Sequence, residues 1–200
     1  NNGIVTAIDI STPKSPKIVS VLTDGTYLTN PSYITIDGKY AYISNYSAAR
    51  MTIVDISNPA NMSVVGSVND GTILNSIEAT YKVGRNLYAV SNGSFAIIDV
   101  ANPTSPSITK SLSDASLGSA AGLAISGKYA YVTADDQDAL VTIYIGTEAN
   151  PVITDVNSTL GVYFGTDIVV AGNYLYIPVN VDVIVVGIGG LDTNSASLGS

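Results

Sequence analysis

The chain has 200 residues and a formal net charge of −8, from 8 basic and 16 acidic side chains. Charged residues make up 12% of the chain, about half the usual share, and 46% is hydrophobic. So few basic residues argue against nucleic-acid binding. Without Cys or His, there is no disulfide, no thiol nucleophile and no imidazole base.

Taken in order, the chain predicts short β-strands throughout and no convincing helical stripe. Residues 1–23 resemble the last two strands of a four-stranded unit, with Pro13 and Pro16 in the bend between them. Residues 165–190 predict only the first three strands of such a unit, and residues 191–200 predict a polar linker. Complete sets of four strands are predicted for residues 32–69, 75–112 and 119–157.

Two columns of residues show that this unit is a repeat. A turn glycine precedes a Tyr-rich strand at positions 46, 43 and 45 residues apart: Gly38, Gly84, Gly127 and Gly172. An apolar strand ends in aspartate at Asp9, Asp55 and Asp99, and the column continues at Tyr144 and Gly187. Four antiparallel strands per roughly 45 residues indicate an all-β fold built of β-propeller blades. The blades occupy residues 1–190 and start and end mid-blade.

Two architectures fit this strand count. The two ends together supply one blade plus a surplus third strand, so strand exchange between them would close a four-blade ring. The alternative is an arc of a larger ring, which the surplus strand favours. The chain opens at Asn1 without Met, and we interpret it as a piece of a longer protein. No run of about 18 apolar residues is present, so we expect no membrane insertion by this segment.

The runs TAIDISTP, TIVDISNP and AIIDVANP, with GKYAYIS and GKYAYVT, resemble the LVIVD-repeat β-propeller family. A weaker similarity links them to the YVTN-type surface-layer propellers. The resemblance covers about residues 1–190; Tyr144 and Gly187 depart from its Asp, and Met62 replaces a second proline. It implies an extracellular or cell-surface scaffold and no catalytic residues.

The recurring Asp9, Asp55 and Asp99 admit two interpretations: a ring of carboxylates, or aspartates that accept hydrogen bonds from turn N–H groups. The second is favoured because a recurring residue usually belongs to the repeat. Asp135, Asp136 and Asp138 share one hairpin tip and could offer oxygen ligands to Ca²⁺. An acidic loop in contact with water is the favoured interpretation, because no calcium-binding motif is present. We expect no other cofactor.

The tyrosines form two groups. One group alternates along the second strands and is expected to pack between blades; it comprises Tyr40, Tyr42, Tyr88, Tyr129, Tyr131, Tyr174 and Tyr176. The other group interrupts the repeat in loops, where aromatic rings can stack on a sugar or a partner; with one phenylalanine it comprises Tyr27, Tyr46, Tyr163 and Phe164. Arg50, at another hairpin tip, could pair with a partner's carboxylate.

We therefore expect a non-enzymatic propeller module of a cell-surface or fibre protein, including a viral or phage fibre. It would act as a scaffold or adhesion element toward other protein modules. The alternative is a tip domain that binds cell-surface glycans or a receptor through its loop aromatics, with or without calcium. An enzyme of the glycosidase or lyase class would need two poised acidic residues, and no spacing in the sequence selects such a pair.

Overall fold

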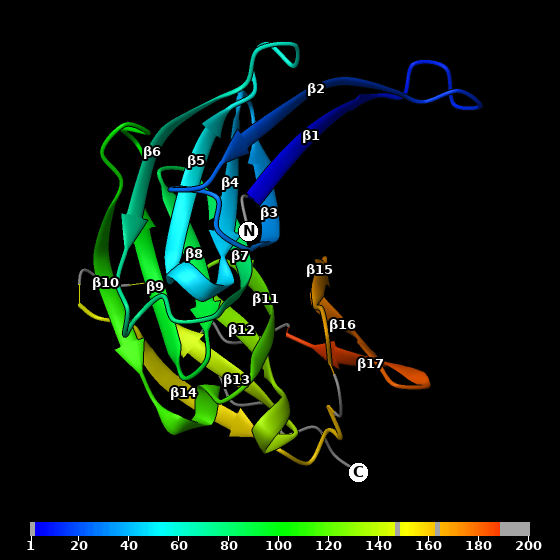
Figure 1. Ribbon diagram of the computed structural model, residues 1–200. Helices are drawn as coiled ribbons and strands as arrows, with labels where there is room; N and C mark the ends of the chain where they lie inside the picture. Colours follow the sequence, from blue (N-terminus) through cyan, green and yellow to red (C-terminus); the bar gives the residue numbers. More distant parts are fainter. Residues whose placement is uncertain (1–2, 147–148, 163–164, 189–200) are drawn as a thin grey trace.

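The computed structural model describes residues 3–146, 149–162 and 165–188, which form five antiparallel sheets and no α-helix (Figure 1). The N-terminal sheet contains β1 (Gly3–Asp9) and β2 (Lys17–Asp24). The first full blade contains β3 (Pro31–Asp37), β4 (Tyr40–Asn45), β5 (Arg50–Asp55) and β6 (Ser63–Asn69). The second contains β7 (Ile77–Val83), β8 (Asn86–Ser91), β9 (Ser94–Asp99) and β10 (Ser107–Ser113). The third contains β11 (Ala120–Ser126), β12 (Tyr129–Ala134), β13 (Ala139–Tyr144) and β14 (Val152–Asn157). The C-terminal sheet contains β15 (Val169–Ala171), β16 (Tyr174–Val179) and β17 (Asp182–Gly187).

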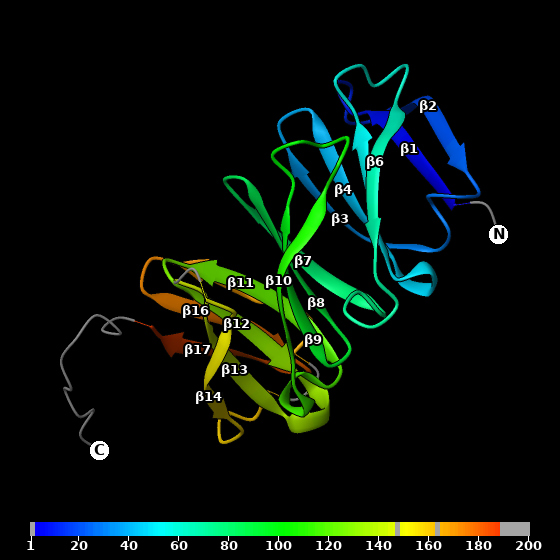
Figure 2. The same cartoon turned by 90° about the vertical axis from the view of Figure 1, so that its left-hand side faces the viewer.

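These sheets stand side by side along a curve, as Figures 1 and 2 show. The first strand of each blade lies innermost, and β7 contacts both β3 and β11. No strand of the N-terminal sheet pairs with a strand of the C-terminal sheet among the described residues. The described chain is therefore an open arc, and the strand exchange that would close a four-blade ring is not observed. The predicted linker, residues 191–200, lies outside the described residues.

The repeat columns of the sequence mark turns and bulges of the backbone. The turn glycines join first to second strands with φ of 56°, 54°, 56° and 60°, the left-handed region where glycine is least strained; they are Gly38, Gly84, Gly127 and Gly172. Third and fourth strands pair around a bulge at one repeat position, beside Ala7, Ile53, Ile97 and Thr142. This recurrence of local geometry explains why the period could be found in the sequence.

The hydrophobic core lies between neighbouring sheets rather than inside one sheet. Tyr42 packs with residues of the first and second full blades, and Tyr88 and Tyr131 occupy the next two interfaces. All three are at most 8% exposed, which confirms the prediction that these rings pack between blades. The prediction is wrong for Tyr174 and Tyr176, which are 52% and 39% exposed because no described sheet covers their face.

The proline bends lie between third and fourth strands, as predicted, and contact the outer strand of the preceding sheet. The Ser20 hydroxyl donates to the Pro59 carbonyl at 2.6 Å. One repeat later, Gly66 occupies the same position, and a Cβ there would lie 2.1 Å from the Pro103 oxygen. A side chain fits at Ser20, but at Gly66 the approach is so close that only glycine fits.

Candidate functional site: the loop face

Every second-to-third-strand connection and every connection between blades emerges on the same side of the arc, which we call the loop face. Two of these connections have the same type of turn. The 3₁₀ turns η1 (Tyr46–Ala48) and η3 (Asp135–Gln137) are each followed by a residue in the left-handed conformation, Ala49 and Asp138 respectively. Hydrogen bonds tie the tips to the neighbouring loops, from Tyr46 N to Asn30 O at 3.1 Å and from Asp135 N to Ser119 O at 3.2 Å. For the first two full blades, Figure 1 shows the loop face below and the opposite hairpin turns above.

The aspartates of the Asp column lie on the opposite face and have structural roles. Asp9 accepts a hydrogen bond from Ser11 N at 2.8 Å, and Asp55 accepts one from Ser57 N at 2.8 Å. Asp99 does the same for Ala101 N at 2.9 Å and also pairs with Arg85. Hydrogen bonds from Ser11 lower the pKa of Asp9, those from Ser57 lower the pKa of Asp55, and the bond from Arg85 lowers the pKa of Asp99. This confirms the turn interpretation.

A second family of polar caps recurs on the loop face, where the fourth strands end. Asp24 accepts from the backbone of Thr26 and Tyr27, both at 2.7 Å. Equivalent caps hold the backbone after Asp70, Asp114 and Asn157. These caps fix the loops that leave each blade, so the loop face is a preorganised surface.

The aromatic residues predicted to bind a sugar or a partner are only partly exposed on this face. Tyr27 is 40% exposed, and one side of its ring carries the Arg50 guanidinium, 5.2 Å from the ring centroid. Arg50 also donates to the Thr26 carbonyl, so its charge is already engaged within the molecule. Tyr46 is 41% exposed in the neighbouring tip. Tyr163 and Phe164 lie outside the described residues.

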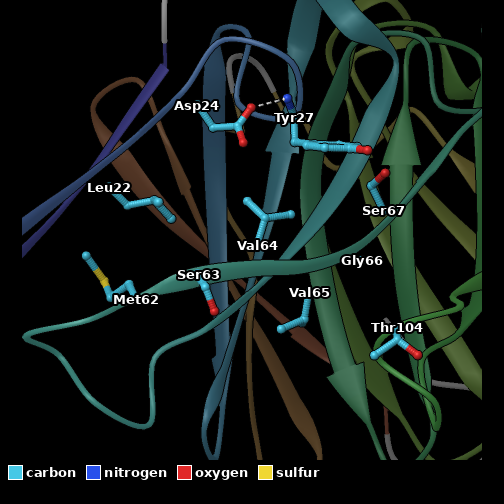
Figure 3. Close-up of a pocket in the computed structure, with 10 residues that line it drawn as sticks. All are labelled: Leu22, Asp24, Tyr27, Met62, Ser63, Val64, Val65, Gly66, Ser67 and Thr104. Atoms are coloured by element: carbon cyan, nitrogen blue, oxygen red, sulfur yellow. Dashed lines mark hydrogen bonds between the residues drawn. The ribbon is translucent and has the colours of Figure 1, made fainter.

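Tyr27 lines an open pocket between β2, β6 and the Thr104 turn (Figure 3). Its wall combines the aliphatic side chains of Leu22 and Val64 with hydroxyl groups such as that of Ser67. Asp24 is the one charged residue in this wall, and its carboxylate is occupied by the loop cap. The pocket therefore offers an aromatic ring and hydroxyl groups, and no poised pair of acids.

The three acids of the hairpin tip do not converge. Across residues 3–146, 149–162 and 165–188, no group of three or more acidic side chains is arranged to hold a metal ion. Burial raises the pKa of Asp135, and the negative charges of Asp138 and Asp136 raise it further. A hydrogen bond from the Gly165 backbone acts in the opposite direction and lowers this pKa. Asp138 takes the left-handed turn conformation that aspartate tolerates well. This geometry gives no support to a calcium site at the tip.

Charge is divided unevenly between the two faces. Arg50 is the one basic residue on the loop face; Lys110 lies on outer strand β10, and the other six lie at or near the opposite turns. Eight acidic residues lie at or beside the loop-face connections: Asp24, Asp70, Asp114, Asp135, Asp136, Asp138, Asp167 and Asp182. The net negative charge of the chain is thus concentrated on one face, which sequence reasoning alone did not predict.

A group near the axis of the arc was also missed. Glu78 takes the bulged position of inner strand β7, where the first and third full blades have Ser32 and Ala121. Burial raises the pKa of Glu78. Burial and the nearby charge of Asp167 raise the pKa of Tyr33 on β3. Aligning the repeats would have exposed Glu78 as the one ionisable residue in its column.

The LVIVD repeat model matches residues 30–70, 86–114, 117–155 and 165–197. The chain belongs to the LVIVD repeat family. One match falls on each of the three full blades and one on the C-terminal sheet; the match on the second blade starts at β8 and leaves out β7. No curated protein matches the chain.

Solved structures similar to this LVIVD-repeat chain include β-propellers. The β-propeller domain of Cps50 (Swd1) from Myceliophteria thermophila has a TM-score of 0.70 and 13% identity, over 91% of this chain and 63% of that one. A putative 6-phosphogluconolactonase from Bacteroides fragilis gives 0.69 and 13%, over 88% and 58%. A protein from Lactobacillus plantarum gives 0.68 and 16%, over 88% and 57%. The chain spans about three fifths of each, and at these identities the likeness shows the propeller fold alone.

No helix in the described part of the chain is long and apolar enough to cross a membrane.

Proposed function

We propose that this chain is a non-enzymatic interaction module of a cell-surface or fibre protein, which presents its loop face to other protein modules. The observation that carries the proposal is the unequal use of the two faces. The repeating glycines and Asp-column aspartates build the opposite face. The loop face has its own recurring caps, but it also holds the residues that do not repeat, among them Tyr27, Tyr46 and Asp136. A rigid scaffold with variable loops is the usual arrangement of a binding surface.

The charge of the loop face indicates the kind of partner. Eight acidic residues and a single, internally engaged Arg50 favour a partner with basic residues at its contact surface. The same negative charge would repel a phosphorylated sugar at this face. We therefore do not propose for it the lactonase activity that names the Bacteroides fragilis structure. Partner binding should weaken as salt is added, because exposed charges are screened beyond about 10 Å at 0.1 M salt.

Surface exposure of the parent protein tests the proposal directly. An antibody against the purified chain should label intact, unpermeabilised cells or particles that make the parent protein. Labelling that requires permeabilisation would overturn the cell-surface role. An antibody to a cytoplasmic protein of the same cells is the control for membrane integrity.

A second candidate function, glycan binding, is favoured by the pocket beside Tyr27. An exposed aromatic face with neighbouring hydroxyl groups is suited to stacking on a sugar ring. On a glycan array, retention that is lost in Tyr27→Ala and kept in Tyr81→Ala would favour this candidate. Tyr81 is the matched control because it is a comparably exposed tyrosine on inner strand β7, away from the pocket. If the unmodified chain retains no glycan, the glycan-binding candidate is rejected and only the protein-module proposal stands.

A further inference from the structure

Three polar side-chain atoms lie buried beneath the β2–β3 loop (residues 25–30), where the first full blade supports it. They are Thr29 Oγ1, Asn45 Oδ1 and Arg50 Nε, and none has a hydrogen-bond partner among the described residues. Nearly every buried polar atom of a folded protein is bonded either to the protein or to an ordered water molecule. Three such atoms in one place therefore call for a common explanation.

Two of these atoms belong to neighbouring residues and are chemically complementary. Asn45 ends β4, Arg50 begins β5, and the two are directly paired in the sheet, so their side chains lie on one face with Cβ atoms about 5 Å apart. The Thr52 hydroxyl donates to the Tyr27 carbonyl at 2.6 Å, so it must accept from the Asn45 amide nitrogen, which is 3.0 Å away. This fixes the orientation of the amide. Its oxygen is left as an acceptor beside the Arg50 Nε–H donor.

The β2–β3 loop places Thr29 over the same strand ends. The carbonyl oxygens of Tyr27 and Asn30, on either side of Thr29, both accept hydrogen bonds from the first full blade. Tyr27 O accepts from Thr52 on β5 at 2.6 Å, and Asn30 O accepts from Tyr46 N, directly after β4, at 3.1 Å. Thr29 is therefore held against the adjoining ends of β4 and β5, where the unpaired donor and acceptor lie.

A polar and charged pair at this position is found in the first full blade but not in the other two. The third full blade has Ala134 paired with Ala139 here, and both are fully buried. The second full blade has Ser91 paired with Ser94. Small side chains are thus sufficient to close a blade interface at this point. An amide and a guanidinium are more costly to bury, and they require polar partners that alanine does not.

We propose that Thr29, Asn45 and Arg50 bind one internal water molecule, which joins the β2–β3 loop to the first full blade. The water oxygen accepts from Arg50 Nε–H, and its two hydrogens donate to Asn45 Oδ1 and Thr29 Oγ1. A metal cation would be repelled by the guanidinium, and an anion by the amide oxygen. A water molecule both accepts and donates, and a buried water typically makes about three hydrogen bonds.

The two arginines of the chain make the site observable by NMR of the purified 200-residue chain. Arg50 and Arg85 give its two side-chain Nε–H signals, and the Arg85 side chain is 68% exposed. Arg50 Nε–H should exchange with solvent much more slowly than Arg85 Nε–H. It should also show a dipolar cross-peak to water in a ROESY spectrum, opposite in sign to a cross-peak caused by proton exchange. A crystal structure should place a water oxygen within about 3.2 Å of both Arg50 Nε and Asn45 Oδ1.

Removal of single hydroxyl groups gives a second test, with effects of opposite sign. Thr29→Val should lower the melting temperature by about 2–4 °C, because it removes one hydrogen bond of the bound water. Ser91→Ala is the matched variant, since the Ser91 hydroxyl is also buried without a partner and the paired Ser94 hydroxyl is already bonded to Ser113. Removing a hydroxyl that has no partner relieves a cost of burial, so Ser91→Ala should leave the melting temperature unchanged or raise it.

Circular dichroism checks that both variants fold. A melting temperature that is unchanged or raised in Thr29→Val would overturn the proposal. A crystal structure in which Arg50 Nε donates directly to Asn45 Oδ1, with no water between them, would overturn it as well. The site lies beneath the loop face and not on it, so these results do not depend on whether the loop face binds a protein module or a glycan.

Discussion

The three full blades and the two terminal sheets are built from the same repeat, yet the same repeat positions meet different surroundings. Tyr131 of the third blade is 3% exposed, and Tyr176 of the C-terminal sheet is 39% exposed. Both stand four residues after their turn glycine. Burial in this fold is therefore a property of the interface between two sheets and not of the residue. A repeat protein of this kind should gain stability with each neighbour that a blade acquires.

The largest expected effect compares one repeat position in the two regions. Ile98→Ala removes a fully buried side chain between the first and second blades and should lower the free energy of unfolding by about 2–5 kcal/mol. Ile8→Ala removes the equivalent but 54% exposed side chain and should cost less than about 1 kcal/mol. Urea unfolding followed by circular dichroism measures both. Equal losses would show that Ile8 is covered in solution.

A smaller effect tests how firmly the C-terminal sheet is attached. The buried Thr133 hydroxyl accepts from Gly122 N at 2.8 Å and donates to the Gly165 carbonyl at 2.6 Å, so it joins the third blade to the segment before β15. Thr133→Val leaves both partners unsatisfied and should cost about 1–3 kcal/mol.

Hydrogen exchange should then speed up in β15–β17 before it does in the second blade. Thr154→Val is the control, because that hydroxyl donates to the Thr142 carbonyl from an exposed position on outer strand β14. Uniform acceleration across all blades would show that the C-terminal sheet unfolds with the rest of the chain.

Local geometry was largely predictable from the sequence, and long-range geometry was not. Gly38 and Asp55 mark turns because each acts on backbone within two or three residues, and the period carries that local information along the chain. Whether a given sheet has a neighbour depends on chain that the repeat does not describe. Tyr174 and Tyr176 were therefore misplaced.

The loop face shows the same division. The hairpin tips containing Tyr46 and Asp135 could be located as tips from strand lengths alone. That Arg50 covers one side of the Tyr27 ring, and that the three tip acids do not converge, depends on side-chain directions across a span of more than twenty residues or around a tight turn. Composition gives the net charge but not its concentration on one face, which follows from the strand order.

The smallest expected difference between full blades and terminal sheets concerns the Asp-column turns. Asp9 and Asp55 make the same turn hydrogen bond, at 2.8 Å in each case, one in the N-terminal sheet and one in a full blade. Because this contact is local, Asp9→Ala and Asp55→Ala should lower the melting temperature by similar amounts, each less than Thr133→Val.

The pH dependence of these two losses should also agree. The turn hydrogen bonds lower the pKa of both carboxyl groups from the ordinary value of 3.8. A carboxyl whose pKa is lower in the folded state stabilises the protein above its unfolded pKa, and this contribution disappears as the pH falls through the folded value. The difference in melting temperature between each variant and the unmodified chain should therefore be full at pH 6 and should shrink below about pH 4. A gap that persists for Asp55→Ala but shrinks for Asp9→Ala would mean that contacts between blades, and not the turn alone, depend on Asp55. The two regions would then differ in their turns as well as in their interfaces.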